Sequence, residues 1–173
     1  YSEVLFTEYY YGTKAGSEYI IGLRKNIANT APIIGKYGLN TSGSPDMYSK
    51  GANLIHTIRT ILSNDVKFRK ILKGLNETFA KKTVSTAEIE SYINIHSGFD
   101  FSKIFDQYLR HSRLPVFEYR IIDNILTYRW NSEVSQFNMP MKIQVGATSQ
   151  FKFLPTSTEW QTININPSLE MET

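Results

Sequence analysis

The chain has 173 residues, of which 41% are hydrophobic and 20% are charged, so it is long enough and apolar enough to bury a core. Nineteen Lys and Arg residues against sixteen Asp and Glu residues give a net charge of +3. These charges form no long block of one sign, so nucleic acid is not expected as a partner. The absence of cysteine excludes disulfides, thiolate metal ligands and a cysteine nucleophile. No segment is apolar over the length that a membrane span requires.

Apolar residues recur at helical spacing through the first two thirds of the chain. Two short helices are expected before residue 28, with Gly12 and Gly16 marking the break between them. Val4, Tyr9 and Ile20 are among the residues expected to face a core. Residues 29–45 are rich in Gly, Pro, Asn and Ser and therefore predict a loop.

A long helical hairpin is expected next. Ser44 as N-cap, with Pro45 in the first turn and Asp46 favourable to the helix dipole, predicts a helix over residues 45–63. Asn64 then caps a second helix that runs to Phe79. Because the connection is short, the two helices are expected to pack antiparallel.

Two further helices are indicated by their start signals. Ser85 and Glu88 are spaced as a capping box, in which each side chain satisfies an amide at the helix start. That helix is expected to continue to His96. Asp100 is expected to cap a last helix that runs to Arg110.

The apolar period changes from helical to alternating after Pro115. Short strands are expected over residues 117–121, 125–130, 141–145, 151–153 and 160–165. Turn signals at Asp123-Asn124, Gly146 and Pro155 separate them, which is typical of an antiparallel β-sandwich. We therefore expect an α+β chain with two domains, a helical one over residues 1–113 and a β domain over residues 114–173.

The side chains that usually carry chemistry give few signals by themselves. His56, His96 and His111 lack a second His or a carboxylate pair at the spacing of a closed metal site, so each is expected to be structural. We interpret His56 as a hydrogen-bonded packing residue. The sequence holds no Gly-rich phosphate loop and no nucleophile elbow.

Gly51 lies in the first turns of a predicted helix, where glycine costs roughly 1 kcal/mol relative to alanine. Close helix packing, or the close approach of another chain or a substrate, would explain it. Tyr48 would then lie at the exposed start of the helix with its hydroxyl available for hydrogen bonding. The alternative is an ordinary surface tyrosine.

A resemblance gives this segment a function. The sequence Tyr48-Ser49-Lys50-Gly51-Ala52 resembles the Tyr-x-Lys-Gly-Ala element of zinc aminopeptidases of the aminopeptidase N family. The segment Tyr1-Ser2-Glu3 resembles the residues just after that family's third zinc ligand, and segments further on match in order as far as Leu114-Pro115. The resemblance implies the helical C-terminal part of a thermolysin-like catalytic domain, followed by a β-sandwich.

In that family the tyrosine acts in the transition state. The resemblance implies that Tyr48 donates a hydrogen bond to the oxyanion formed when a zinc-bound water attacks the scissile carbonyl of a peptide substrate. Removing one such donor costs on the order of 3 kcal/mol. Lys50 and Gly51 are expected to pack behind the tyrosine or support it. Glu3 is expected to support the metal-binding helix from behind.

The family's His-Glu-x-x-His motif is missing from this sequence, and so is its Gly-x-Met-Glu-Asn-type element for the substrate amino terminus. We therefore expect a fragment of a longer zinc aminopeptidase that removes N-terminal residues from peptides. Zinc belongs to the parent enzyme, and this chain by itself is expected to bind none and to be inactive.

Two other functions remain open at this stage. One is a non-catalytic relative that uses the aminopeptidase shape as a scaffold for protein binding, and the other is a self-contained binding module whose match at Tyr48 is accidental. The fragment hypothesis predicts exposed apolar surface on the helix over residues 1–12, where the metal-binding helices would pack. It also predicts self-association of the isolated chain through that surface.

Overall fold

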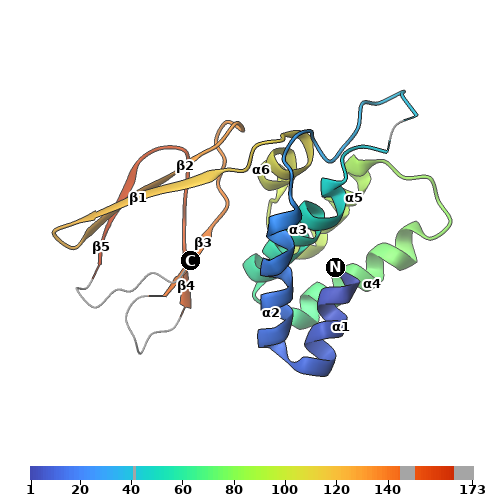
Figure 1. The fold of residues 1–173 in the computed structure, drawn as a ribbon, viewed down its shortest axis with the longest axis horizontal. Helices are drawn as coiled ribbons and strands as arrows, with labels where there is room; N and C mark the ends of the chain where they lie inside the picture. Colours follow the sequence, from blue (N-terminus) through green and yellow to red (C-terminus); the bar gives the residue numbers. More distant parts are fainter. Residues whose placement is uncertain (41, 145–150, 166–173) are drawn as a thin grey trace. The chain divides into compact units, whose positions relative to one another are not determined.

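The chain forms two compact units in a computed structural model, which describes residues 1–40, 42–144 and 151–165 (Figure 1). The first unit, Tyr1–Arg113, is helical, and the second, Leu114–Thr173, contains antiparallel strands. The predicted α+β class is therefore confirmed. The division falls where the hydrophobic period changes from helical to alternating.

The helical unit contains long and short elements connected by loops. Those described are α1 (Ser2–Tyr11), α2 (Thr13–Gly22), the 3₁₀ turn η1 (Leu23–Asn26), α3 (Asp46–Leu62), α4 (Asp65–Phe79), α5 (Thr86–Ser97), α6 (Ser102–Phe105) and the π-helical turn η2 (Asp106–Arg110). Two predicted caps are confirmed. The Asn64 side chain accepts a hydrogen bond from the Lys67 amide at 2.9 Å, and Ser85 and Glu88 form a complete capping box.

Two predicted helix starts are shifted in the structure. Helix α3 begins at Asp46 with Pro45 at the N-cap position, one residue later than predicted, although the Ser44 hydroxyl accepts a hydrogen bond from the Asp46 amide at 3.2 Å. The helix that Asp100 was expected to cap begins at Ser102 with Phe101 at the N-cap position, and from Asp106 it continues as the π turn η2. The carbonyl of Leu109 in that turn accepts a hydrogen bond from the Ile34 amide at 3.1 Å, so a tertiary contact competes with regular helix pairing.

Tyr9 was also predicted wrongly, because its side chain is 82% exposed. Helix α1 packs on α2 through Val4 and Glu8, which are four residues apart and share one face. Val4 and Ile20 are buried together, as predicted. Tyr9 follows Glu8 by one residue, so it turns roughly 100° away from the packed face.

The β unit consists of two antiparallel sheets. One has the strand order β1-β2-β5, with bounds Val116–Ile122, Ile125–Asn131 and Gln161–Asn164; the other pairs β3 (Met141–Gln144) with β4 (Phe151–Leu154). Asp123 and Asn124 have positive φ values of 50° and 60°, as a two-residue hairpin turn requires. The predicted strand end at Val145 and the turn at Gly146 lie outside the described residues.

The two sheets bury one shared apolar core. Leu126 and Tyr128 of β2 pack with Ile143 of β3 and Leu154 of β4. The Tyr128 hydroxyl donates a hydrogen bond to the Pro155 carbonyl at 3.1 Å, so its polar end is satisfied. Alternating burial along β2 reflects one face turned to this core.

Candidate functional site

Tyr48 projects from the first turn of α3 and is 76% exposed. Asp46 and Lys50, two residues before and after it, are buried. Since each residue turns an α-helix by about 100°, positions two apart lie on nearly opposite faces. The buried pair therefore holds one side of the helix while Tyr48 presents its hydroxyl on the other side.

Asp46 anchors the start of α3. Its carboxylate oxygens accept hydrogen bonds from the amides of Ala28, at 2.8 Å, and Asn29, at 2.7 Å. These bonds fix the chain that follows η1 against the beginning of α3. The sequence assigned Asp46 only to the helix dipole, because its amide donors are 17 and 18 residues away in the chain.

Lys50 anchors the same turn on its buried side. Its side chain is fully buried, and Nζ donates to the carbonyl oxygens of His111 at 2.9 Å and Ser112 at 3.0 Å. Carbonyl dipoles compensate the cost of burying an ammonium group. Lys50 thus ties α3 to the segment after η2.

Gly51 has no close packing partner among the described residues. Apart from its chain neighbours and the backbone of its own helix, a Cβ atom built at this position meets no described atom within 4 Å, so close helix packing is not the reason for this glycine. Tyr48, Gly51 and Ile55 follow one another at spacings of three and four, which places them along one face of α3. That face is open beside Tyr48.

Arg59 joins three helices. Its guanidinium donates to both carboxylate oxygens of Glu8 on α1, at 2.6 and 2.7 Å, and to both of Asp65 on α4, at 2.8 and 2.7 Å. These bonds lower the pKa of Glu8 and the pKa of Asp65. They also raise the pKa of Arg59, and the bonds to Glu8 have a larger effect than those to Asp65. Such paired, charge-assisted bonds fix geometry as well as adding stability. Arg59 was not among the site residues predicted from the sequence, because its partners lie on other helices.

The remaining predicted site residue, Glu3, has its partner on α2. Its carboxylate accepts a hydrogen bond from the Tyr19 hydroxyl at 2.8 Å, and this bond raises the pKa of Tyr19. Both side chains are exposed. The structure therefore places Glu3 on the α1–α2 pair, whereas Tyr48, Lys50 and Gly51 share α3.

The histidines have structural contacts. His56 Nδ1 lies 3.2 Å from the Tyr1 hydroxyl, and burial lowers the pKa of His56, which confirms it as a hydrogen-bonded packing residue. His96 Nδ1 lies 2.8 Å from the Tyr92 carbonyl oxygen, and its ring stacks on the Tyr92 ring. Within the part of the chain that the structure describes, no three His, Cys, Asp or Glu side chains are grouped to hold a metal ion. These residues therefore do not fit a zinc site.

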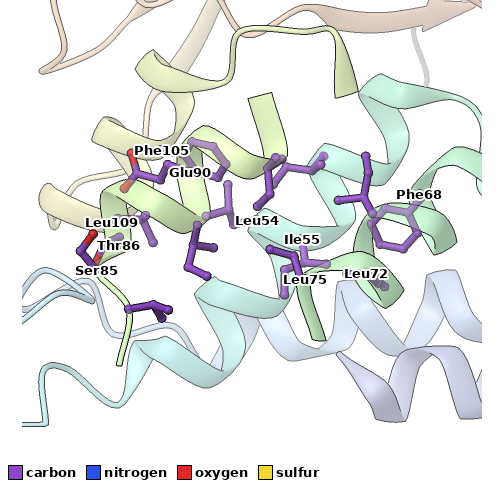
Figure 2. Close-up of a pocket in the computed structure, with 15 residues that line it drawn as sticks. Leu54, Ile55, Phe68, Leu72, Leu75, Ser85, Thr86, Glu90, Phe105 and Leu109 are labelled. Atoms are coloured by element: carbon purple, nitrogen blue, oxygen red, sulfur yellow. The ribbon is translucent and has the colours of Figure 1, made fainter. Parts of the chain in front are cut away.

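An apolar pocket of about 470 Å³ lies between α3, α4, α5 and η2 (Figure 2). Ile55, Phe68 and Leu72 contribute to its wall, and Ser85, Thr86 and Glu90 are its polar lining residues. The Glu90 carboxylate is bound by Arg110 at 2.6 Å. The pocket can therefore receive apolar groups by burial, but it offers no unpaired carboxylate for acid–base chemistry.

Aromatic side chains gather on the exposed side of α1. We define the α1 aromatic surface as Phe6, Tyr9, Tyr10 and Tyr11, all of which are exposed. The ring centroids of Phe6 and Tyr10 lie 4.5 Å apart, and those of Tyr9 and Tyr10 lie 5.0 Å apart. Clusters of exposed aromatic side chains are typical of interaction surfaces.

Comparisons with known proteins add no family to these observations. A scan against protein-family models gave no match, and a search of curated proteins gave none. No helix among the described residues is long and apolar enough to cross a membrane. A function for the chain is therefore proposed from the geometry around Tyr48 together with the resemblance of its sequence.

Proposed function

We propose that this chain is part of a zinc-dependent aminopeptidase that hydrolyses N-terminal residues from peptides, and that Tyr48 is its oxyanion-stabilising residue. The observation that carries the proposal is an exposed tyrosine on a helix turn whose opposite side is fixed by hydrogen bonds of the buried Asp46 and Lys50 side chains. Its phenolic hydroxyl donates a hydrogen bond to the oxygen of the scissile carbonyl as negative charge develops there. Such a donor accelerates the reaction because the charge exists only in the transition state.

The anchors around Tyr48 support this proposal, because catalysis by a hydrogen-bond donor requires that the donor be held in place beforehand. Asp46 and Lys50 hold the turn through four hydrogen bonds of 2.7–3.0 Å. Asn53, one turn further on, donates to the Ile20 carbonyl at 3.4 Å and accepts from Arg24 at 3.2 Å. The backbone that carries Tyr48 is therefore fixed to α2 and η1 as well as to the segment after η2.

Gly51 fits the same proposal. Since no described atom approaches its Cβ position within 4 Å, a peptide substrate can pass close to α3 beside Tyr48. A side chain at residue 51 would take up part of that space. This is the substrate-approach explanation for a glycine that costs helix stability.

Zinc enters the proposal only through the parent protein. The described residues hold no metal-binding group, and the sequence has no His-Glu-x-x-His motif, so another part of the parent supplies the ligands and the general base. The α1 aromatic surface supports this view, because exposed aromatic side chains favour burial against further structure. Under the proposal this isolated chain is inactive.

The test is hydrolysis of aminoacyl chromogenic substrates by the full-length parent, with and without a zinc chelator. We expect chelator-sensitive activity whose kcat falls roughly a hundredfold in Tyr48→Phe, as for loss of one oxyanion donor. Tyr37→Phe is the matched control, because Tyr37 is also an exposed tyrosine of the helical unit. We expect this control to retain full activity.

A different outcome would reassign the protein. A zinc-loaded parent without peptidase activity, whose function is also unchanged by Tyr48→Phe, would contradict the proposal and favour a non-catalytic scaffold for protein binding. Chelator-sensitive activity that is insensitive to Tyr48→Phe would leave an aminopeptidase but reject the assignment of Tyr48.

A further inference from the structure

Strand β1 forms one edge of the three-stranded sheet, and no strand pairs with its outer side within the described ranges of the chain (Figure 1). Tyr119 and Ile121 of β1 are 48% and 44% exposed, although their β2 partners Tyr128 and Leu126 are buried. The apolar face of the sheet therefore continues to an open edge. Long, apolar, unpaired edge strands are templates for strand addition.

The hydrogen bonds of β2 show which backbone groups of β1 point away from the sheet. The Ile165 amide donates to the Asn124 carbonyl, and the Trp130 amide donates to the Ser157 carbonyl, so even-numbered residues of β2 direct their backbone groups away from β1. Odd-numbered residues of β2 therefore bond to β1. In the observed register these pair with even-numbered residues of β1. The amides and carbonyls of Phe117, Tyr119 and Ile121 consequently point outward.

The sequence of this edge is complementary to itself. If two copies of β1 pair antiparallel about a two-fold axis at Tyr119, Phe117 faces Ile121 of the second copy, and both are outward-bonding residues. Glu118 then faces Arg120 of the second copy, directly across the ladder, where opposite charges stabilise a pair. The outermost pair is Val116 with Ile122.

Neighbouring registers are worse. A shift of the two-fold axis to Glu118 places two carboxylates opposite each other, and a shift to Arg120 places two guanidinium groups opposite each other, which is destabilising. The Glu118 carboxylate is also held in position, because it accepts from Arg129 at 2.7 Å and from Asn131 at 3.0 Å. It therefore loses little additional freedom when it accepts a second arginine.

We propose that β1 is a homodimerisation strand, which pairs antiparallel with β1 of a second copy of this chain about Tyr119. The two sheets join into one across the two-fold axis. Six outward backbone hydrogen bonds form, counted from three outward residues in each copy, and the exposed sides of Tyr119 and Ile121 are covered. The arrangement is a closed, isologous contact, and it does not rest on the proposed peptidase function.

The first test is sedimentation equilibrium of the 173-residue chain from micromolar to millimolar concentration. We expect a monomer–dimer equilibrium that Arg120→Glu and Glu118→Arg each weaken by roughly tenfold or more, because each places like charges opposite one another. Mixing the two variants restores opposite charges at both positions and should give a heterodimer. Lys152→Glu, at an exposed position of β4, is the charge-matched control and should dimerise like the unchanged chain.

Backbone amide hydrogen exchange identifies the surface directly. We expect the amides of Phe117, Tyr119 and Ile121 to gain protection as concentration rises, whereas those of Glu118 and Arg120 are already protected by β2. Tyr119→Pro provides a second variant, because it removes an outward amide and leaves the bonds to β2 in place. It should abolish the dimer.

Several results would overturn the proposal. One is a chain that remains monomeric at millimolar concentration. Another is a dimer that Arg120→Glu, Glu118→Arg and Tyr119→Pro all leave unchanged, or that Lys152→Glu weakens equally. A dimer without new protection at Tyr119 would also reject it, since association through the α1 aromatic surface would behave in that way.

Discussion

The ammonium group of Lys50 lies 2.9 Å from the carbonyl oxygen of His111, a residue 61 positions later in the chain. The same group donates to the Ser112 carbonyl at 3.0 Å. One buried side chain thus connects the turn that carries Tyr48 to the last residues of the helical unit. Damage to this connection should affect both stability and the proposed activity.

Replacing Lys50 with methionine should lower the free energy of unfolding of the helical unit by about 2–4 kcal/mol, because buried carbonyl groups lose a charged donor. Urea unfolding followed by far-ultraviolet circular dichroism measures the change. Lys14→Met is the control, since Lys14 is a highly exposed lysine. Equal stability of both variants would show that the carbonyls find other donors at no cost.

Removal of the Asp46 carboxylate should be similarly costly. Asp46→Ala leaves the amides of Ala28 and Asn29 without the acceptors seen in the structure, at a cost of about 2–4 kcal/mol. Asp46→Asn, which keeps one acceptor oxygen, should lose about half as much. The measurement is again the free energy of unfolding in urea. A loss below about 0.5 kcal/mol, the size of a helix-dipole interaction alone, would show that the bonds to Ala28 and Asn29 add no stability.

The ion pair between Arg59 and Glu8 should make stability depend on pH. Hydrogen bonding to Arg59 holds the folded-state pKa of Glu8 below its ordinary value of 4.5. The stabilisation is therefore fully present above that value and is lost as pH falls through the lower folded pKa. Glu8→Gln should cost about 1–3 kcal/mol at pH 7.

The difference in unfolding free energy between the unchanged chain and Glu8→Gln should shrink as pH falls from neutral to about 3. Taking the difference removes contributions from distant carboxylates whose folded pKa is also lowered, such as Glu88 and Glu118. A difference that stays constant with pH would mean that the glutamate stabilises by packing and not by charge.

Two glycine-to-alanine substitutions should have opposite effects. Gly51→Ala should stabilise the chain by about 0.5–1 kcal/mol, because alanine favours the helix and no described atom lies within 4 Å of the new Cβ. Gly16→Ala should destabilise it, because its Cβ would lie 2.9 Å from the Cβ of Glu8. Thermal unfolding of the two variants measures both signs.

Under the proposed function, Gly51→Ala should lower kcat/KM of the full-length parent while it raises stability, because substrate would pass beside Tyr48. Aminoacyl substrate hydrolysis at matched protein concentration measures this effect. Full activity together with higher stability would show that the open face at Gly51 is not used by substrate.

The sequence alone determined features whose physical causes are local. The cap at Asn64 and the capping box at Ser85 and Glu88 depend on a side chain and amides within three residues. The hairpin turn at Asp123-Asn124 depends on residues that tolerate positive φ. The α+β class likewise follows from a change of hydrophobic period, which can be counted along the chain.

Only the tertiary structure decided the features that join distant residues. Lys50 and Asp46 have buried partners that no local pattern reveals, and Tyr9 is exposed because Val4 and Glu8 occupy the packed face of α1. The resemblance marked the Tyr48 segment, whereas its anchors came from the fold. The outward groups of β1 also depend on register with β2. Hydrogen bonding and burial between remote segments are fixed by three-dimensional packing, which overrides what each residue's sequence neighbours suggest.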